Sequence, residues 1–220
     1  MGYEEQKIEG RNAVLEAFRS GKTIDKLFVL DGCQDGPVRT IVREARKHDT
    51  IINFVDKERL DQLSETKKHQ GVIAVAAAYE YAEVEDILKN AEEKGEPPFI
   101  FILDNIEDPH NLGAIIRTAN LAGAHGVIIP KRRAVGLTTT VAKTSAGAIN
   151  YTPVAKVTNL TAAIKELKEK GLWFVCADMG GTEMYKLELK GPIGLVIGNE
   201  GEGVSLSLIH ISEPTRPLYI

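Results

Sequence analysis

Two segments of this sequence combine polar side chains with turn-forming residues, and the first spans residues 103–123, LDNIEDPHNLGAIIRTANLAG. Asp108 opens a turn, and Asn111 can cap a helix that begins at Leu112. Asn111 then stands at a helix N-terminus, which attracts anions, and Arg117 projects from the same helix six residues later. An amide and a planar cation could together hold one anionic substrate. A capped turn followed by a surface arginine explains the same residues, so both readings stay open.

The second segment is GNEGEG, residues 198–203, directly after an apolar run. Its glycines permit positive φ angles and let the backbone approach a ligand closely. Placing Asn199 and Glu200 at the mouth of a buried strand is costly unless the carboxylate has a partner. The segment is not a GxGxxG motif, because Glu200 fills the third position, and it has no Walker lysine. The alternative is a tight turn.

A basic run, Lys131, Arg132 and Arg133, follows the apolar segment GVIIP at 126–130. Such a run is either a solvated loop or a contact for phosphate groups. His110 is best interpreted as a turn residue rather than as a catalytic base.

Alternating strands and helices must position these segments. Apolar strands are predicted at 99–103, 126–130, 172–178 and 193–198, and helices over 112–123 and 159–171. This alternation predicts a mostly parallel sheet covered on both faces. Ligands bind beyond the carboxyl ends of such strands. We therefore expect the site in the loops 104–111, 178–184 and 198–203.

The first 78 residues form their own pattern of short strands and helices. Helices are predicted from Asn12 to Phe18 and from Pro37 onward, with strands at 26–31, 51–56 and 71–78. The last of these strands, GVIAVAAA, should be buried on both faces. The pattern predicts a separate small α/β module.

Residues 79–98 separate the two units and carry most of the charge imbalance. They contain seven acidic and two basic residues, in a chain of net charge −4, and end in Pro97-Pro98. They hold a short acidic helix, VEDILKNAEEKG, and the proline pair stops both helix and strand, so we predict an acidic linker here. Because the rest of the chain is balanced, the charge neither requires nor excludes an RNA partner.

The composition fits a globular protein of one or two domains. The chain has 220 residues, of which 43% are hydrophobic and 26% charged. It has no apolar run near the ~20 residues of a membrane span, and its first residues are too polar for a signal peptide. Cys33 and Cys176 lack the CxxC spacing of a zinc site. These features favour a cytoplasmic protein with free thiols and no metal.

The motifs resemble those of a known enzyme family. The segments DPHNLGAIIRTA (108–119) and GNEGEG (198–203) are similar to the first and second motifs of the SpoU (TrmH-type) RNA 2′-O-ribose methyltransferases. Residues 8–18, IEGRNAVLEAF, and 69–74, HQGVIA, resemble that family's N-terminal RNA-binding domain. The resemblance covers residues 7–204, and it is greatest to the branch that methylates a guanosine of large-subunit ribosomal RNA.

The resemblance implies a fold, a cofactor and a set of roles. The fold would be a small N-terminal α/β RNA-binding domain followed by an α/β SPOUT methyltransferase domain with a trefoil knot. The cofactor would be S-adenosylmethionine, the assembly a homodimer, and the substrate ribosomal RNA or transfer RNA. The candidate catalytic residues are Asn111, Arg117 and Glu200, where Glu200 could hold Arg117 in an ion pair. The candidate cofactor-binding residues are Ile197, Gly198, Asn199 and Gly201, and the candidate RNA-binding residues are Arg11, Lys131, Arg132 and Arg133.

The C-terminal residues depart from the family pattern. The family has a third motif after GNEGEG that closes the knot, whereas this chain continues as SLSLIHISEPTRPLYI. We therefore predict an RNA-binding domain over 1–78, a linker over 79–98, a truncated methyltransferase domain over 99–204 and a non-family, artefactual tail over 205–220. In that case the knot-forming segment is missing, the tail lies on the surface, and the chain itself is inactive.

Two other functions stay open at this stage. One is a non-catalytic RNA-binding or ribosome-binding protein that uses the N-terminal module. The other is a nucleotide-binding Rossmann-type enzyme. Against the latter, the glycine-rich loop follows the last strand rather than the first, and no acidic residue follows at the expected spacing.

Overall fold

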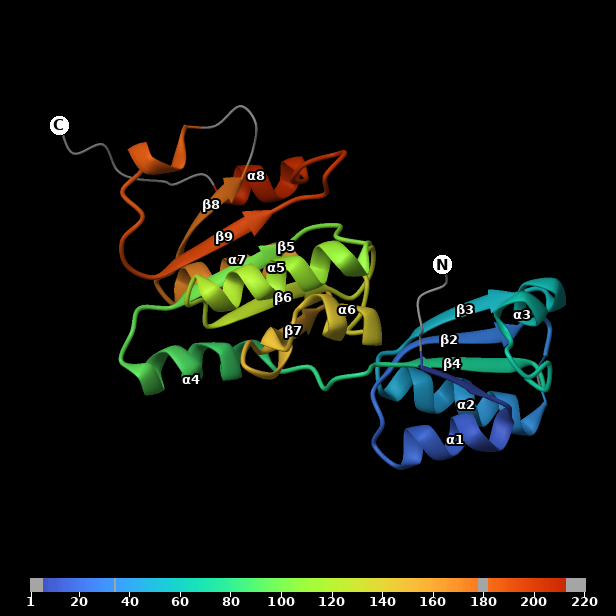
Figure 1. Ribbon diagram of the computed structural model, residues 1–220. Coiled ribbons are helices and arrows are strands. Elements are labelled where there is room, and N and C mark those ends of the chain that lie inside the picture. Colours follow the sequence, from blue (N-terminus) through green and yellow to red (C-terminus); the bar gives the residue numbers. More distant parts are fainter. Residues whose placement is uncertain (1–5, 34, 178–181, 213–220) are drawn as a thin grey trace. The chain divides into compact units, whose positions relative to one another are not determined.

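The computed structural model describes residues 6–33, 35–177 and 182–212. They form two units, one of the described residues up to 80 with 136–139, and one of residues 81–135 with the described residues from 140 onward (Figure 1). The α/β organisation predicted from the sequence is confirmed: a small sheet unit precedes a unit built on a parallel sheet. Among the described residues, no helix is both long and apolar enough to cross a membrane.

The first unit is a four-stranded sheet with three helices. The strands lie in the order β1-β4-β2-β3, with β2 and β3 parallel and β4 antiparallel to both β1 and β2. The elements are β1 (Gln6–Glu9), α1 (Arg11–Arg19), β2 (Ile24–Leu30), α2 (Gly36–Lys47), β3 (Ile51–Val55), α3 (Lys57–Leu63) and β4 (Val72–Ala76). The sequence pattern did not predict β1.

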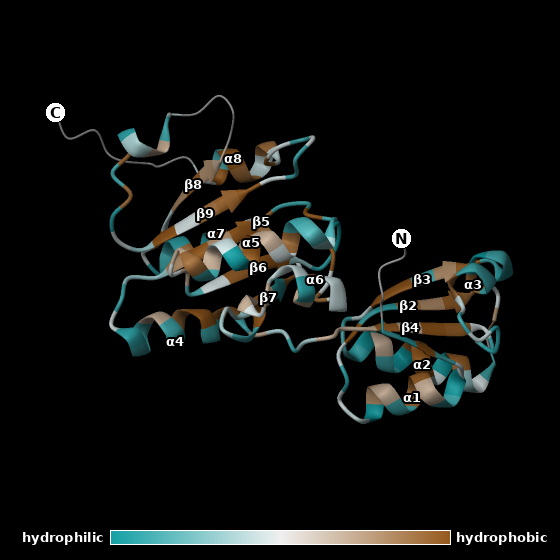
Figure 2. Ribbon diagram, in the orientation of Figure 1, coloured by the Kyte–Doolittle hydropathy of each residue, from teal (hydrophilic) through white to brown (hydrophobic). Residues whose placement is uncertain are grey.

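The core of this unit lies between the sheet and the helices α1 and α2. Val14 and Phe18 of α1 and Ile41 of α2 pack with Leu27 and other strand residues in one buried cluster. Every residue of β4 is buried, as predicted for a strand covered on both faces. Helix α3 lies against β2 and β4. Figure 2 shows the same strands as hydrophobic ribbons.

The second unit is a five-stranded parallel sheet in the order β7-β6-β5-β9-β8. Its elements are α4 (Val84–Lys94), β5 (Phe99–Leu103), α5 (Pro109–Leu121), β6 (Gly126–Pro130), α6 (Thr139–Thr144), β7 (Val154–Val157), α7 (Leu160–Glu169), β8 (Trp173–Ala177), β9 (Ile193–Ile197) and α8 (Leu206–Ser212), with 3-10 turns at Ala148–Asn150 and Met184–Lys186. The predicted strands are present. The sequence pattern did not predict β7, α6 or α8.

One face of this sheet is covered by α4, α7 and α8. Ile87 of α4, Ile164 of α7 and Leu208 of α8 belong to one buried cluster with strand residues such as Ile102 and Phe174. The buried residues of α5, among them Leu112 and Ile116, are not in this cluster. The sheet is therefore buried on both faces, which explains why its strands are continuous apolar runs.

The acidic stretch 79–98 is not a free linker, which corrects our prediction. Its helix α4 presents seven exposed or half-exposed polar residues to solvent but buries Ile87 and Ala91. Gly126 of β6 makes room for Ile87, because a Cβ at Gly126 would lie 2.5 Å from Ile87 Cγ1. The stretch therefore contributes a packed helix to the second unit.

The segment after Val204 also differs from our prediction. We expected residues 205–220 to lie on the surface, but residues 206–212 form α8, in which Leu208 is 2% exposed. The helix packs against α7 and β8, and Lys168 of α7 donates to the Ile211 carbonyl. The apolar residues 208, 209 and 211 pack in or against the buried cluster, so residues 206–212 belong to the core. Residues 213–220 lie outside the described residues.

Candidate active site

The arrangement of the strands places two of the predicted loops side by side. The chain runs from β5 outward to β6 and β7, and then returns to the other side of β5 through β8 and β9. Because β5 and β9 are parallel neighbours, the loops after Leu103 and after Ile197 leave the same edge of the sheet. Such a reversal of strand order is where open α/β sheets bind ligands.

Hydrogen bonds tie these two loops together. Asp104 N donates to the Ile197 carbonyl at 2.8 Å, and Asn199 Nδ2 donates to the Asn105 carbonyl at 3.0 Å. The Asp104 carboxylate is buried and accepts from Ser205 N at 2.9 Å. Asn105 itself adopts a positive φ of 57°. The two segments, distant in the chain, are therefore joined by hydrogen bonds at one edge of the sheet.

The GNEGEG segment folds as a closed turn around Asn199. Asn199 Oδ1 accepts from Gly201 N at 2.8 Å, while Asn199 and Gly203 exchange two backbone hydrogen bonds. Gly198 has no space for a side chain, since a Cβ there would lie 2.1 Å from the Gly203 carbonyl carbon. Glu200, at the tip of the turn, is exposed. The spacing of the glycines is thus explained by the closed turn itself. The backbone on the outer side of the turn is left exposed.

Helix α5 begins earlier than predicted. Its N-cap is Asp108, whose Oδ1 accepts from His110 N at 2.6 Å, and its first residue is Pro109. The prediction that Asn111 caps a helix starting at Leu112 was wrong, because an aspartate followed by proline at the first helical position is the stronger start signal. Asn111 is the third residue of the helix and is exposed. It still lies in the first turn, near the edge where the loops meet.

Arg117 lies farther from this edge than Asn111. Six helical residues separate the two by about 9 Å along the axis and roughly 120° around it. The Arg117 side chain is exposed. Within the described residues, no ion pair joins Arg117 to Glu200. The pairing that we hypothesised between them is therefore not formed in this chain.

The basic run leaves the same edge of the sheet beside β5. Lys131 N donates to the Val157 carbonyl, and Val135 N donates to Ile106 O at 2.9 Å, which joins this loop to the first. Arg132 and Arg133 are exposed, and Arg133 has a φ of 56°. The structure thus brings the 131–133 run, the α5 N-terminus and the 198–203 turn to one sheet edge.

Sequence reasoning missed three contributors to this edge: Asp104, Asn105 and Ser205. A signal for the first was present, because a buried aspartate directly after an apolar strand needs a partner. It also missed α6, whose Thr144 Oγ1 lies 3.3 Å from the Pro109 carbonyl of α5. Of the predicted loop 178–184, residues 178–181 lie outside the described residues. Among the described residues, no three His, Cys, Asp or Glu side chains group as metal ligands would.

Comparison with known families decides the class. A model of the SpoU rRNA Methylase family matches residues 98–216, and a model described as RNA 2′-O ribose methyltransferase substrate binding matches residues 7–82. The chain belongs to the SpoU rRNA methylase family. The resemblance stated from the motifs is confirmed, and the family match continues past Val204, where we expected it to end.

Relatives are similar along nearly the whole chain. It is 48% identical over 205 residues to a Bacillus subtilis (strain 168) protein, YacO, whose name refers to the TrmH family of tRNA/rRNA methyltransferases, covering 93% of this chain and 82% of that one. It is 44% identical over 203 residues to a Staphylococcus aureus (strain MW2) protein named for the same family, covering 92% and 82%.

Solved structures share the fold. The SpoU methyltransferase AviRb from Streptomyces viridochromogenes, in complex with AdoMet, aligns with a TM-score of 0.55 and 20% identity, over 95% of this chain and 78% of that chain. An AdoMet-bound rRNA methyltransferase from Sinorhizobium meliloti aligns with a TM-score of 0.51 and 23% identity, over 93% and 74%. The two-unit α/β architecture is thus that of SpoU methyltransferases.

In this SpoU family member, the two N-terminal segments singled out by their sequence lie next to each other. Arg11 N donates to Gln70 Oε1 at 3.1 Å, and Arg11 Nε donates to the Gln70 carbonyl at 3.0 Å. Arg11 also forms a 2.6 Å ion pair with Asp35. The Arg11 guanidinium is therefore held between Gln70, which precedes β4, and Asp35, which precedes α2.

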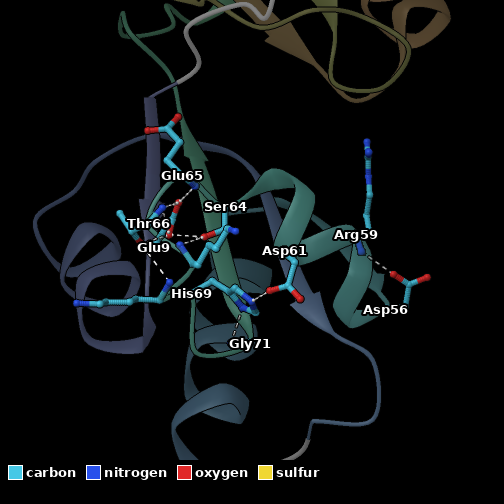
Figure 3. A network of polar contacts seen from close by, with 11 residues as sticks. Glu9, Asp56, Arg59, Asp61, Ser64, Glu65, Thr66, His69 and Gly71 are labelled. Carbon is cyan, nitrogen blue, oxygen red and sulfur yellow. Dashed lines mark hydrogen bonds and ion pairs between the residues drawn. The ribbon is translucent and has the colours of Figure 1, made fainter.

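A carboxylate fixes the loop between α3 and β4. Glu9 accepts hydrogen bonds from Ser64 Oγ (2.8 Å), Glu65 N (2.5 Å) and Thr66 Oγ1 (Figure 3). In the same loop His69 Nδ1 accepts from Gly71 N at 3.0 Å, so its Nε2 donates to Asp61. Burial by itself raises the pKa of Glu9, but the hydrogen bonds from Thr66, Glu65 and Ser64 outweigh it and hold the pKa below its ordinary value.

Proposed function

We propose that this SpoU family member transfers a methyl group from S-adenosylmethionine to a ribose 2′-hydroxyl of RNA. This proposal departs from our prediction that the chain itself is inactive, because the family match continues to residue 216 and residues 206–212 pack into the core. The preferred substrate is a guanosine of large-subunit ribosomal RNA rather than transfer RNA. The observation that carries the proposal is the joining of the two motif loops, in which Asn199 Nδ2 contacts the Asn105 carbonyl at the β5–β9 edge. Chains of this family are RNA methylases.

The residues at this edge fit the proposed cofactor. Gly201 is exposed, and a Cβ placed there would meet only Asn199 Oδ1, at 3.5 Å. The turn therefore offers side-chain-free backbone to a flat adenine ring. Ile197, Gly198, Asn199 and Gly201 would hold the cofactor, which supplies the methyl group when bound. The AdoMet-bound neighbours with this fold are consistent with the assignment.

The polar side chains have separate tasks in this proposal. A ribose hydroxyl is a weak nucleophile, so it must be positioned and helped to lose its proton, which would pass to solvent water as the hydroxyl oxygen takes the methyl group from the sulfonium. Arg117 binds the phosphate beside the target ribose and stabilises the developing negative charge. It is a poor general base, because arginine stays protonated. Asn111 orients the hydroxyl. Glu200, which forms no ion pair with Arg117 here, is a candidate catalytic residue at the exposed tip of the turn.

The partners follow from the same reading. Lys131, Arg132 and Arg133 contact RNA phosphates at the sheet edge, and Arg11 does so on the first unit. As in the family resemblance, the working unit of the family would be a homodimer with a trefoil knot. That this chain lacks the segment that closes the knot stays a prediction. An enzyme acting on ribosomal or transfer RNA would work in the cytoplasm.

The test is a methyl-transfer assay with the full chain. It is incubated with S-adenosylmethionine carrying a tritiated methyl group and with transcripts of large-subunit ribosomal RNA or of transfer RNA. The proposal expects label in alkali-resistant dinucleotides, because a 2′-O-methyl group blocks cleavage of the adjacent bond. Calorimetry with S-adenosylmethionine and with NAD provides the second measurement. Label on a base contradicts the proposal, as does NAD binding. RNA binding without transfer would support a non-catalytic RNA-binding protein.

A further inference from the structure

An open cavity of about 350 Å³ lies on the first unit, lined by residues of α2 and of the edge strand β3. No residue of this cavity belongs to the candidate active site. Its floor is apolar and its rim is cationic. The lining residues are Cys33, Val38, Val42 and Phe54, together with Arg39, Arg43 and Arg46.

Phe54 is the unusual residue of the floor. It pairs in register with Val29 across the parallel β2–β3 ladder, and Val29 is fully buried. Paired residues point to the same face of a sheet, so Phe54 points to the face that α1 and α2 cover. It is nonetheless 54% exposed, because β3 is the edge strand of the sheet and α2 packs against only part of it. A large aromatic ring is thus left open beside the helix.

The arginines form one stripe along α2. Positions 39, 43 and 46 follow the i, i+4, i+7 spacing of a single helix face. Helix α2 has four basic residues and one acidic residue, in a chain whose net charge is −4. The acidic residue, Glu44, lies 2.9 Å from Lys47 Nζ and 3.9 Å from Arg43 Nε. The carboxylate of this helix is therefore engaged mainly by Lys47, and the helix carries an excess of three positive charges, four basic residues against one acidic.

We infer that this cavity binds one unpaired nucleotide of the RNA substrate. The base lies against the Phe54 ring, and the flanking phosphates contact the arginine stripe. Stacking on an aromatic side chain suits any base because every base has a π-face, and the guanidinium fork matches phosphate oxygens. Only single-stranded RNA can present an unstacked base. The volume is at the lower end of small-ligand sites, which suits one nucleotide. That the nucleic acid is RNA rests on the proposed function.

The test measures RNA binding by the full chain without S-adenosylmethionine. The probe is a fluorescein-labelled, 12-nucleotide single-stranded RNA of mixed sequence, followed by fluorescence anisotropy at several salt concentrations. Phe54→Ser should weaken binding about 10-fold. The pair Arg43→Gln and Arg46→Gln should lower the slope of log affinity against log salt by about 1.4, since each phosphate contact on a single strand contributes about 0.7. Circular dichroism checks that each variant is folded.

A matched control separates this site from general charge. Arg19→Gln with Arg59→Gln removes the same two charges from exposed positions outside the cavity, and it should change affinity less than 2-fold. Phe54→Trp keeps the aromatic face, so it should retain affinity and show fluorescence quenching by RNA above the background of Trp173.

Several results would overturn the inference. They are unchanged affinity in Phe54→Ser, an equal loss in the control pair, no quenching in Phe54→Trp, or equal competition by an RNA duplex or by an acidic peptide of the same charge. The outcomes are independent of the proposed function. A chain that binds RNA through the cavity but transfers no methyl group refutes only the function, whereas methylation with an unchanged KM in Phe54→Ser refutes only the cavity.

Discussion

The side-chain amide of Asn199 donates a 3.0 Å hydrogen bond to the backbone carbonyl of Asn105, 94 positions earlier in the chain. The same asparagine closes its own turn, because Oδ1 accepts from Gly201 N. One side chain therefore shapes the second motif and fastens it to the first. The candidate site is built from backbone that is already in place, so ligand binding there requires little ordering of the loops.

The first prediction concerns the two glycines beside Asn199. Gly198→Ala should abolish binding of S-adenosylmethionine, because its Cβ would lie 2.1 Å from backbone and the turn must open. Gly201→Ala is the matched control in the same turn, since its Cβ would meet one side-chain oxygen at 3.5 Å. It should keep the turn and reduce affinity only by crowding the ligand. Calorimetry measures both. Equal affinities for wild type and Gly198→Ala would contradict this reading of the turn.

The second prediction separates Arg117 from Glu200. Arg117→Ala should lower methyl transfer about 100-fold while leaving the fold intact, because the proposed function places its exposed guanidinium on the substrate rather than in the core. Arg117→Lys should restore little, since a point charge does not reproduce the planar fork. Arg19→Ala, an exposed arginine of the first unit, is the control. All are measured with tritiated methyl groups under single-turnover conditions.

Glu200 completes this experiment. Because no ion pair joins it to Arg117, the losses from Glu200→Gln and Arg117→Ala should multiply in the double variant. A double variant no worse than Arg117→Ala alone would show instead that the two side chains meet when RNA is bound.

The third prediction concerns Glu9 and pH. Since its folded pKa is lowered, its stabilising contribution is complete above the ordinary glutamate pKa of about 4.3. It is lost as the pH falls through the lower folded value. Glu9→Gln should lower the stability of the first unit at pH 7 by about 1 kcal/mol, because the hydrogen bonds of a half-buried carboxylate are partly screened by solvent. The difference in stability from wild type should shrink toward pH 3.

Thermal unfolding followed by circular dichroism measures this difference, with the exposed Glu16→Gln as control. A difference that stays constant with pH would contradict the assignment.

Much of the second unit could be predicted because its strands are buried on both faces. Continuous apolar runs such as 99–103 and 193–197 are visible without any partner, and the motif residues follow them directly. The cap of α5 could not be placed as easily, because Asp108 and Asn111 are both good caps three residues apart. The proline after Asp108 decides between them.

Other elements depend on contacts that no local pattern shows. Helix α8 has only seven residues, too few to be stable alone, and it forms because Leu208 and its neighbours pack against β8 and α7. The cavity beside Phe54 could not be predicted from the sequence, for a related reason. The arginine spacing is visible in the sequence, but the strand register that turns Phe54 toward α2 is not.

The last prediction tests whether α4 belongs to the core. The acidic face of this helix suggested a linker, although Val84, Ile87, Leu88 and Ala91 repeat at the spacing of a buried helix face. Gly126→Ala would force its Cβ against Ile87, at 2.5 Å from Cγ1, and overpacking of this kind costs about 1–3 kcal/mol. Ile87→Ala alone should cost about 2–5 kcal/mol through the cavity it leaves. In the double variant the new methyl group occupies part of that cavity, so its cost should be smaller than the sum of the two.

Urea unfolding measures all three, and Gly36→Ala, whose Cβ would meet nothing within 4 Å, is the control. Full stability in both single variants would show that α4 is a linker after all.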